Sequence, residues 1–399
     1  MNLIAIPAND WRKVQREGER TRDAHLIREL SESAQVESLL IVNRPIGLAE
    51  MAYRRTWWKS QGTVIHSNGR GHLVQIGPKS FVLDLLDRSI LGPIFNGKGH
   101  FFDSYGSFAL KEAVDWNRIV LGMNDCACVS FTIYAAALFS QMECEVKHFD
   151  AWDNFLRFPT NNNILPRLKE AYTTYSRTAT SWSTNSEENR AYYDVMLGVP
   201  DATVIRNGVR PEAFKQLYSM PADLLDIPRP IVGMGLKVTH LLDVELLNRV
   251  MWANPRTSFV LVGQIIDRAV FSRIRKLSNF HYLGDKHYKD YPAYVTNFDA
   301  CLIPYCLGKQ QHGGDAIKFY EYLAANKPIV ATPGNGVTDD YEGVWLRTSP
   351  SLFGEAVLAA LEHGPIARKL PENINWTYKA QQLLDAITSG CRKEDLYVV

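Results

Sequence analysis

Residues 313–332 read Gly-Gly-Asp-Ala-Ile-Lys-Phe-Tyr-Glu-Tyr-Leu-Ala-Ala-Asn-Lys-Pro-Ile-Val-Ala-Thr, a glycine-rich loop that leads into a helix, a turn and a buried strand. Glycines before a helix let backbone amides approach an anion, and the helix N-terminus adds roughly half a positive charge. Lys318 adds a mobile full charge, and Glu321, three residues later, lies on nearly the same helical face. A phosphate beside Lys318 would therefore leave its attached ribose within reach of Glu321. The alternative is an exposed ion pair between the two side chains.

Apolar runs and amphipathic stretches alternate around this segment, which predicts a doubly wound α/β domain with a parallel sheet. Strands are expected at 231–234, 258–262, 280–283, 300–304, 328–332 and 343–346. Helices are expected at 242–251, 268–276, 289–295, 316–325 and 351–362. In such a domain, ligands bind at the carboxyl ends of the strands.

The first half of the chain alternates less regularly and predicts another Rossmann-like domain. Strands are expected at 3–7, 36–42, 118–123, 143–149 and 202–205, and helices at 18–30, 129–139, 164–172 and 185–197. Residues 47–115 mix glycine, asparagine and aromatic residues, and no elements are assigned there. The expected domains are 1–205 and 206–375, with a helix in 376–399 that crosses back to the first. Proline-rich stretches at 220–221 and 227–230 are interpreted as the interdomain linker.

The length of 399 residues allows two domains, each with a core of its own. Lys and Arg total 44 against 43 for Asp and Glu, so no overall charge draws the chain to nucleic acid. The N-terminus lacks the basic and long apolar regions of a signal peptide. No apolar run approaches the roughly 18 residues of a spanning helix. We therefore expect a cytoplasmic protein.

The segment around Lys318 resembles the nucleotide-binding signature of GT-B glycosyltransferases of family 4. Further motifs agree in order and spacing, at 204–209, 231–235, 255–263, 280–284 and 298–304, and the resemblance covers 185–387. Segments 11–25, 40–45 and 149–153 are similar to teichuronic-acid and other bacterial surface-polysaccharide glycosyltransferases. The resemblance implies an α/β GT-B fold of two Rossmann-like domains with a deep cleft between them. The C-terminal domain would hold a nucleoside-diphosphate sugar, expected to be uridine-based. No metal or other cofactor is expected, and the chain has no Asp-x-Asp pair to chelate a metal between donor phosphates.

The resemblance also implies roles for single residues on the donor side. Gly235 and Lys237 would contact the diphosphate, and the nucleobase would lie against the loop from Gly284 to Tyr288. The expected donor-binding set is Gly235, Lys237, Gly284, Lys286, Tyr288, Gly314, Asp315, Ile317, Lys318 and Glu321. Many retaining members carry two glutamates eight positions apart, and this chain has Gly313 at the first position. Asp315 is the expected substitute in contacting donor hydroxyls, and the choice between retention and inversion stays open.

A base near the acceptor hydroxyl is needed for an inverting transfer. Asp125 follows the strand expected at 118–123 and is the candidate catalytic base, at the sheet edge that would face the donor domain. Its alternative role is to cap a helix expected at 126–139. Trp11, Arg22 and His25 are candidates for acceptor binding, and the alternative is that they decorate a helix face.

Residues 54–59, Arg-Arg-Thr-Trp-Trp-Lys, interleave basic and aromatic side chains. Such a stretch suits a membrane interface and, with it, a lipid-linked acceptor. The alternatives are tryptophans in the core, or a nucleic-acid patch, which the neutral net charge disfavours. The expected partners are therefore a nucleoside-diphosphate sugar and a glycan, lipid-linked or small-molecule acceptor. Peripheral contact with the inner face of the plasma membrane is also expected, and nucleic acid is not.

The predicted function is sugar transfer in cell-surface polysaccharide synthesis, and two rival functions share its features. A nucleotide-sugar 2-epimerase uses the same architecture with acid and base carboxylates at the cleft and no second substrate. A non-catalytic nucleotide-sugar sensor would have lost turnover together with the glutamate that Gly313 replaces. Isotope exchange at the donor's C2 without acceptor indicates the epimerase, and tight donor binding without turnover indicates the sensor.

Overall fold

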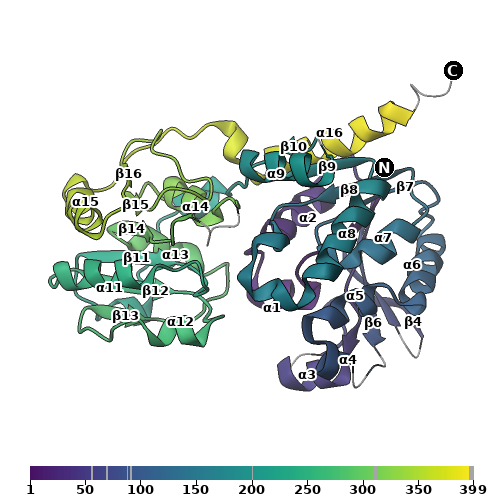
Figure 1. Ribbon diagram of the computed structural model, residues 1–399, viewed down its shortest axis with the longest axis horizontal. Helices are drawn as coiled ribbons and strands as arrows, with labels where there is room; N and C mark the ends of the chain where they lie inside the picture. Colours follow the sequence, from purple (N-terminus) through teal and green to yellow (C-terminus); the bar gives the residue numbers. More distant parts are fainter. Residues whose placement is uncertain are drawn as a thin grey trace. The chain divides into compact units, whose positions relative to one another are not determined.

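The computed structural model describes residues 1–54, 57–68, 71–87, 89, 92–199, 201–308 and 313–394. The chain forms two compact units (Figure 1). Unit 1 consists of Met1–Arg206 and Thr377–Val399, and unit 2 of Asn207–Trp376. The prediction of an interdomain linker at 220–221 and 227–230 is wrong, because unit 2 begins at Asn207 and Ile227 is buried in its core.

Unit 1 is built on a ten-stranded sheet with the order β10-β9-β8-β7-β1-β2-β6-β5-β4, and β3 lies beside β6. The strands are β1 (Asn2–Ile6), β2 (Ser38–Val42), β3 (Ile46–Gly47), β4 (Thr63–Asn68), β5 (Gly71–Gly77), β6 (Ser80–Asp87), β7 (Cys126–Ser130), β8 (Val146–Asp150), β9 (Ser181–Thr184) and β10 (Thr203–Val204). The sheet is parallel except where β5 pairs with β4 and β6. The strand order reverses between β1 and β7, and such a switch point is where doubly wound domains bind ligands.

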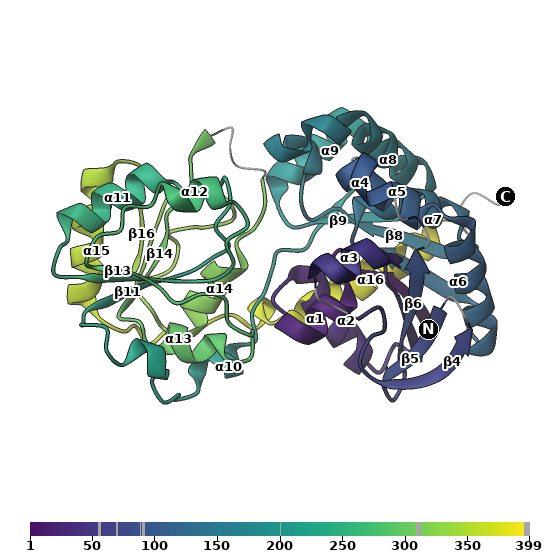
Figure 2. The ribbon, with the colours of Figure 1, turned by 90° about the horizontal axis from the view of Figure 1, so that it is seen from below.

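Helices cover both faces of this sheet, with α2 and α16 on one face and α7 and α8 on the other (Figure 2). The helices are α1 (Trp11–Glu17), α2 (Arg22–Glu32), α3 (Leu48–Arg54), α4 (Gly92–Asn96), α5 (His100–Tyr105), α6 (Phe108–Val120), α7 (Ala136–Gln141), α8 (Leu165–Thr178), α9 (Glu187–Leu197) and α16 (Trp376–Glu394). From Thr377 onward α16 belongs to unit 1, where the Thr377 hydroxyl donates to Glu29 Oε2 at 2.8 Å. The C-terminal helix therefore returns to the N-terminal unit.

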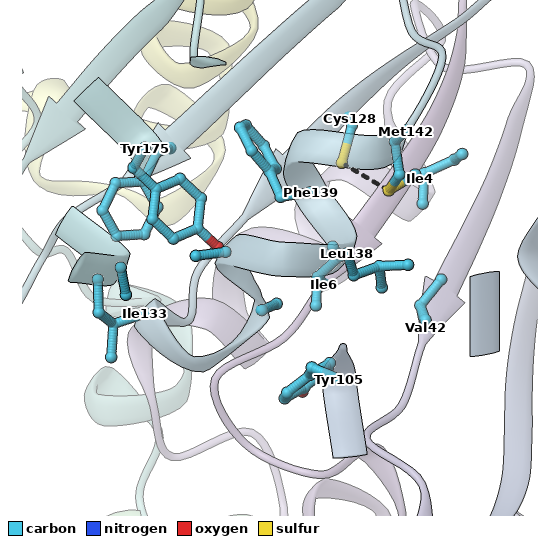
Figure 3. Packing of buried hydrophobic residues seen from close by; sticks show 14 of the residues in the cluster. Ile4, Ile6, Val42, Tyr105, Cys128, Ile133, Leu138, Phe139, Met142 and Tyr175 are labelled. Carbon is cyan, nitrogen blue, oxygen red and sulfur yellow. Dashed lines mark hydrogen bonds between the residues drawn. The ribbon is translucent and has the colours of Figure 1, made fainter. Parts of the chain in front are cut away.

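The core of unit 1 follows from the alternation of side chains along its strands. Ile4 and Ile6 of β1 point to the same face and pack with Phe139 of α7 and Tyr175 of α8 (Figure 3). The Tyr175 ring stacks on Phe149 of β8 at 3.7 Å between ring centres. Its hydroxyl donates to the Thr132 carbonyl at 2.7 Å, so the buried polar atom is satisfied.

The predicted elements around residue 120 are wrong. Residues 118–120 end α6 and are not part of a strand, and the segment predicted as helix 129–139 begins inside β7. Helix α6 buries Leu110, Val114 and Asn117, which is the spacing of one helical face. The apolar run at its end is too short for periodicity to distinguish a strand from a helix.

Unit 2 has a six-stranded parallel sheet with the order β13-β12-β11-β14-β15-β16. The strands are β11 (Ile231–Gly235), β12 (Ser258–Val262), β13 (Phe280–Tyr282), β14 (Ala300–Ile303), β15 (Ile329–Ala331) and β16 (Val344–Leu346). The helices are α10 (Pro211–Lys215), α11 (Val244–Ala253), α12 (Arg268–Ser272), α13 (Tyr291–Asn297), α14 (Ile317–Ala324) and α15 (Pro350–His363). Side chains of α11 and α15 form one core layer, and those of α10, α13 and α14 form the other. The switch point lies between β11 and β14.

No helix in the described part of the chain is both long and apolar enough to cross a bilayer.

Candidate functional site

Lys318 lies in the first turn of α14, at the switch point of unit 2. Its ammonium group donates a hydrogen bond to the Tyr305 hydroxyl and lies 4.9 Å from the centre of the Tyr305 ring. Tyr305 follows β14 and is held by Thr332, whose Oγ1 accepts from its N–H at 3.0 Å and donates to its carbonyl at 2.8 Å. Two strand ends thus position the lysine. Tyr305 and Thr332 were not among the predicted site residues, although Tyr305 directly follows the strand predicted at 300–304 and Thr332 ends the strand predicted at 328–332.

Glu321 lies one turn further along α14 and is buried. Its Oε1 accepts a hydrogen bond from the Tyr288 hydroxyl at 2.7 Å. Burial raises the pKa of Glu321 to about 7, although the hydrogen bond from Tyr288 and the charge of Lys318 act to lower it. The alternative of an exposed ion pair between Lys318 and Glu321 is wrong, because Glu321 is not exposed.

Gly235 ends β11 beside this helix. Its N–H donates to the Tyr322 hydroxyl at 2.7 Å, and a Cβ at this position would lie 1.7 Å from the Tyr291 hydroxyl. Packing against two tyrosines therefore requires glycine here. A direct contact of Gly235 with a diphosphate stays a prediction.

Three loops at the carboxyl edge of the sheet are tied together by their backbones. The Leu236 N–H donates to the Val262 carbonyl at 3.0 Å, and the Gly263 N–H donates to the Gly284 carbonyl at 2.9 Å. Gly284 has a φ of 77°, in the left-handed region, and no atom lies within 4 Å of the place a Cβ would take. Lys237, half-buried, lies in the first of these loops.

Lys286 anchors the third loop to the body of unit 2. Its Nζ lies 2.6 Å from Asp223 Oδ2 and 5.3 Å from the centre of the Tyr294 ring. Burial lowers the pKa of Lys286, but the hydrogen bonds with Asp223 and Tyr294 outweigh it and raise the pKa overall. The structure gives Lys286 an anchoring role, and its contact with a nucleobase stays a prediction.

The carboxylate of Asp315 is bonded to groups of the protein itself, whereas a carboxylate that contacts donor hydroxyls was expected. Its Oδ2 accepts from the Asn207 N–H, and its Oδ1 accepts from the Tyr320 hydroxyl at 2.9 Å. Asp315 is buried and joins the start of unit 2 to α14. The structure therefore corrects its role to that of a positioning residue. Gly314 is buried beside it, and Ile317, the first residue of α14, is half-buried.

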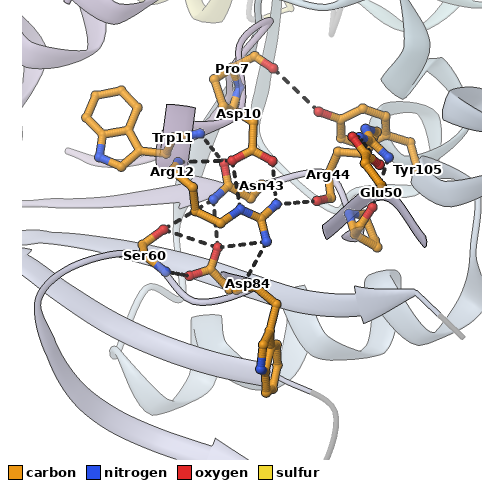
Figure 4. Close-up of polar contacts among 12 residues, drawn as sticks. Pro7, Asp10, Trp11, Arg12, Asn43, Arg44, Glu50, Ser60, Asp84 and Tyr105 are labelled. Carbon is orange, nitrogen blue, oxygen red and sulfur yellow. Dashed lines mark hydrogen bonds and ion pairs between the residues drawn. The ribbon is translucent and has the colours of Figure 1, made fainter. Parts of the chain in front are cut away.

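The carboxyl edge of the unit 1 sheet carries a buried polar network that the sequence analysis did not assign (Figure 4). Arg12 Nε donates to Asp10 Oδ1 at 2.7 Å, and Arg12 Nη1 lies 3.7 Å from Asp84 Oδ1. Asp84 also accepts from Asn43 Nδ2 at 2.7 Å and from the Ser60 N–H at 2.6 Å. Burial raises the pKa of Asp84, and Arg12 only partly offsets this. The signal available in the sequence was Asn43, a polar residue that directly follows the buried strand predicted at 36–42.

Two of the three candidates for acceptor binding lie in the core of unit 1. Arg22 is buried and makes a bidentate contact with Asp150 at 2.8 and 3.0 Å, and its Nη1 donates to the Ile205 carbonyl at 2.7 Å. His25 is fully buried in α2. Their predicted roles in direct acceptor contact are wrong, because their side chains do not reach the surface. Trp11 begins α1, where its N–H donates to Asn43 Oδ1 at 2.7 Å, and its acceptor role stays a prediction.

Asp125 lies at the opposite edge of the sheet from the one predicted. It precedes β7, and its carbonyl accepts from Asn2 Nδ2 at 3.1 Å, beside the first residue of β1. Strands β1 and β7 are parallel, so this is their amino edge, away from the switch-point loops. The premise for Asp125 as a base is therefore wrong, and so is the alternative of a helix cap, since a strand follows it.

Of the basic and aromatic stretch 54–59, Arg55 and Thr56 lie outside the described residues. Trp57 is exposed, and the Trp58 ring lies 4.1 Å from the His72 ring. The alternative that both tryptophans belong to the core is therefore wrong for Trp57.

Comparison with solved structures shows the same architecture over the whole chain. Sucrose-phosphate synthase from Thermosynechococcus elongatus matches with a TM-score of 0.60 and 13% identity, covering 100% of this chain and 98% of that one. Trehalose-6-phosphate synthase OtsA matches with a TM-score of 0.62 and 12% identity, covering 100% and 99%. Anabaena Alr3699/HepE in complex with UDP-glucose matches with a TM-score of 0.57 and 12% identity, covering 100% of both chains.

The chain has the GT-B fold. The predicted class, α/β with two Rossmann-like domains, is thereby confirmed. No family model matches the chain. A curated relative, "Putative teichuronic acid biosynthesis glycosyltransferase TuaH" of Bacillus subtilis strain 168, is 25% identical over 132 residues. The match covers 32% of this chain and 33% of the relative, so the chain matches about a third of that relative's length.

Proposed function

We propose that this GT-B protein is a glycosyltransferase that moves a sugar from a nucleoside-diphosphate donor, with uridine as the expected nucleoside. The observation that carries the proposal is the placement of Lys318 and Glu321 one turn apart on α14, at the switch point of unit 2. A cation and a buried carboxylate one turn apart match the two ends of a ribose diphosphate. Two of the similar solved structures name UDP-glucose or UDP-2-fluoro glucose as their ligand, which supports a donor of this class.

The donor diphosphate would be neutralised by Lys318, Lys237 and the N-terminus of α14. Glu321 would accept hydrogen bonds from the ribose hydroxyls, and the nucleobase would lie against the loop from Gly284 to Tyr288. We propose that no metal takes part. Asp125 lies at the amino edge of the unit 1 sheet, so we do not propose it as the base. The leaving diphosphate would then assist the acceptor hydroxyl, which favours a retaining transfer.

The acceptor in this proposal is a glycan, a lipid-linked sugar or a small molecule used in cell-surface polysaccharide synthesis. The partial match to a protein named for teichuronic acid biosynthesis supports that setting. We propose that the transfer takes place in the cytoplasm. A lipid-linked acceptor would bring unit 1 to the inner face of the plasma membrane.

A screen of nucleoside-diphosphate sugars, read by nucleotide release with and without a chelator, tests the proposal. We expect acceptor-dependent release from one donor, unchanged by EDTA. Tight donor binding without release over a broad acceptor panel would favour the sensor, and C2 isotope exchange without acceptor would favour the epimerase. Release that EDTA abolishes would contradict the metal-independent step.

A further inference from the structure

Two cysteine side chains of unit 1 meet at the amino edge of its sheet. Cys126 is the first residue of β7, and Cys144 lies two residues before β8. Their Sγ atoms lie 3.4 Å apart, and both residues are thiols in the structure. A disulfide bond joins its two sulfur atoms at about 2.05 Å, so the pair needs to approach by only roughly 1 Å to bond.

The backbone already holds the two cysteines in this position. Strands β7 and β8 are parallel neighbours, and Ala127 is paired with Val146. One residue earlier, the Glu145 N–H donates to the Cys126 carbonyl at 3.2 Å. Because the ladder fixes both main chains, the bond can close by rotation of the side chains with little movement of the strands.

A third cysteine, Cys128, competes for the same partner. It lies on the same face of β7 as Cys126, because side chains alternate along a strand. Its Sγ donates to Met142 Sδ at 3.7 Å (Figure 3). In the ladder Cys128 is paired with Lys147, three residues beyond Cys144. The register and the sulfur distance of 3.4 Å therefore both favour Cys126 as the partner of Cys144.

The two thiols differ in access and in ionisation. Cys126 is 4% exposed, whereas Cys144 is half-buried and can be reached by a small oxidant. The hydrogen bond with Cys126 acts to lower the pKa of Cys144, but a hydrogen bond with Cys128 and burial outweigh it and raise that pKa overall. The contact with Cys144 and burial raise the pKa of Cys126. Since the thiolate is the reactive form, Cys144 reacts first, and its reaction quickens as pH rises.

We propose that Cys126 and Cys144 form a reversible disulfide in the presence of a low-molecular-weight disulfide. The Cys144 thiolate attacks one sulfur of that small disulfide, forms a mixed disulfide with it and releases the first small thiol. The Cys126 thiolate then attacks the Cys144 sulfur, closes the bond and releases the second small thiol. The protein loses two protons and two electrons, and the small disulfide takes them up to become two thiols. The inference does not depend on the donor site, because both cysteines lie in unit 1.

The disulfide would close a loop over residues 126–144, which contains β7 and α7. A cross-link over a loop of this length restricts the unfolded chain and lowers the unfolding equilibrium constant by roughly a hundredfold. Oxidation therefore stabilises unit 1 against opening.

Mass spectrometry of the folded full-length protein after treatment with oxidised glutathione tests this proposal. The wild type should lose two hydrogen atoms in mass and retain no glutathione at this pair, and peptide mapping should join Cys126 to Cys144. The bond should form about tenfold faster at pH 8.5 than at pH 7.5. Hydrogen exchange of the β7 and β8 amides should slow by roughly tenfold or more, and dithiothreitol should restore it.

Cys128→Ser is the matched control, and it should form the same disulfide as the wild type. Cys126→Ser should stop at the mixed disulfide, with glutathione held on Cys144. Circular dichroism checks that both variants are folded. The proposal is overturned if the folded wild type forms no disulfide, if it retains glutathione on Cys144, or if Cys126→Ser joins Cys144 to Cys128. Unchanged hydrogen exchange in the oxidised protein would overturn the stabilising effect.

Discussion

The Tyr288 hydroxyl donates a 2.7 Å hydrogen bond to Oε1 of Glu321 and so joins the loop after β13 to helix α14. Both residues lie at the carboxyl edge of the unit 2 sheet, where doubly wound domains bind ligands. Because burial raises the pKa of Glu321 to about 7, this carboxyl group changes charge near neutral pH. Its protonation state therefore links nucleotide binding and stability to pH.

Nucleotide affinity should rise between pH 6 and pH 8. Only the ionised carboxylate of Glu321 accepts hydrogen bonds from both ribose hydroxyls, so binding of UDP should tighten by about tenfold over this range. Isothermal titration calorimetry of wild type and Glu321→Gln measures the effect, and the variant corrects for ionisation of the phosphate. An identical pH dependence in both proteins would remove Glu321 from the ribose site.

Stability should show the opposite trend. A pKa raised in the folded state favours folding below the ordinary pKa of glutamate, and that contribution is lost as pH rises through about 7. Relative to Glu321→Gln, the wild type should lose up to roughly 3 kcal/mol of unfolding free energy between pH 4.5 and pH 8. Urea denaturation at a series of pH values measures this difference. A constant difference between the two proteins would contradict the buried, titrating carboxyl group.

The Gly235→Ala substitution should destabilise unit 2. The added Cβ would lie 1.7 Å from the Tyr291 hydroxyl, so the ring must move, at a cost of about 1–3 kcal/mol. Gly354→Ala in α15 is the matched control, since its Cβ would meet no atom nearer than 3.5 Å and alanine favours a helix. Chemical denaturation should show a loss for the first variant and none for the second. Equal losses of stability in the two variants would show that the close contact between Gly235 and Tyr291 does not set the cost of the substitution.

The Asp125→Asn substitution should leave turnover within about twofold of wild type, because the residue lies at the amino edge of the unit 1 sheet. A base that acted on the acceptor would instead cost roughly a hundredfold in turnover. Once a donor and acceptor pair is known, steady-state kinetics of this variant distinguishes the two. A hundredfold loss in a stable protein would restore Asp125 as a base.

Most of unit 2 could be predicted from its sequence, because its strands are short apolar runs separated by clear helical patterns. The segments predicted at 258–262 and 300–304 correspond to β12 and β14. The elements of unit 1 were harder to predict, because three antiparallel strands, β4, β5 and β6, and the short helices α3, α4 and α5 interrupt the parallel pattern. Exposed strand β4 shows no alternation between buried and exposed positions, so its pattern carries little signal.

The candidate site, too, could be predicted only in part from the sequence. Lys318 and Glu321 could be selected because their spacing on one helix has a direct chemical meaning. The partners of these residues could not, since Tyr305 and Tyr288 lie 13 and 33 residues away along the chain and meet them only after folding. Arg22 was misassigned because its partner Asp150 is 128 residues distant. A buried ion pair of that separation leaves no local pattern.

The most direct test of the central claim is the affinity of UDP for Lys318→Ala, measured by calorimetry on the folded full-length protein. The lost charge acts on the phosphates whether or not a sugar is attached, so affinity should fall by about ten- to a hundredfold. Lys276→Ala, an exposed lysine before β13 at the amino edge of the same sheet, should bind UDP as the wild type does. Unchanged affinity in Lys318→Ala, or an equal loss in Lys276→Ala, would contradict a nucleotide site at the start of α14.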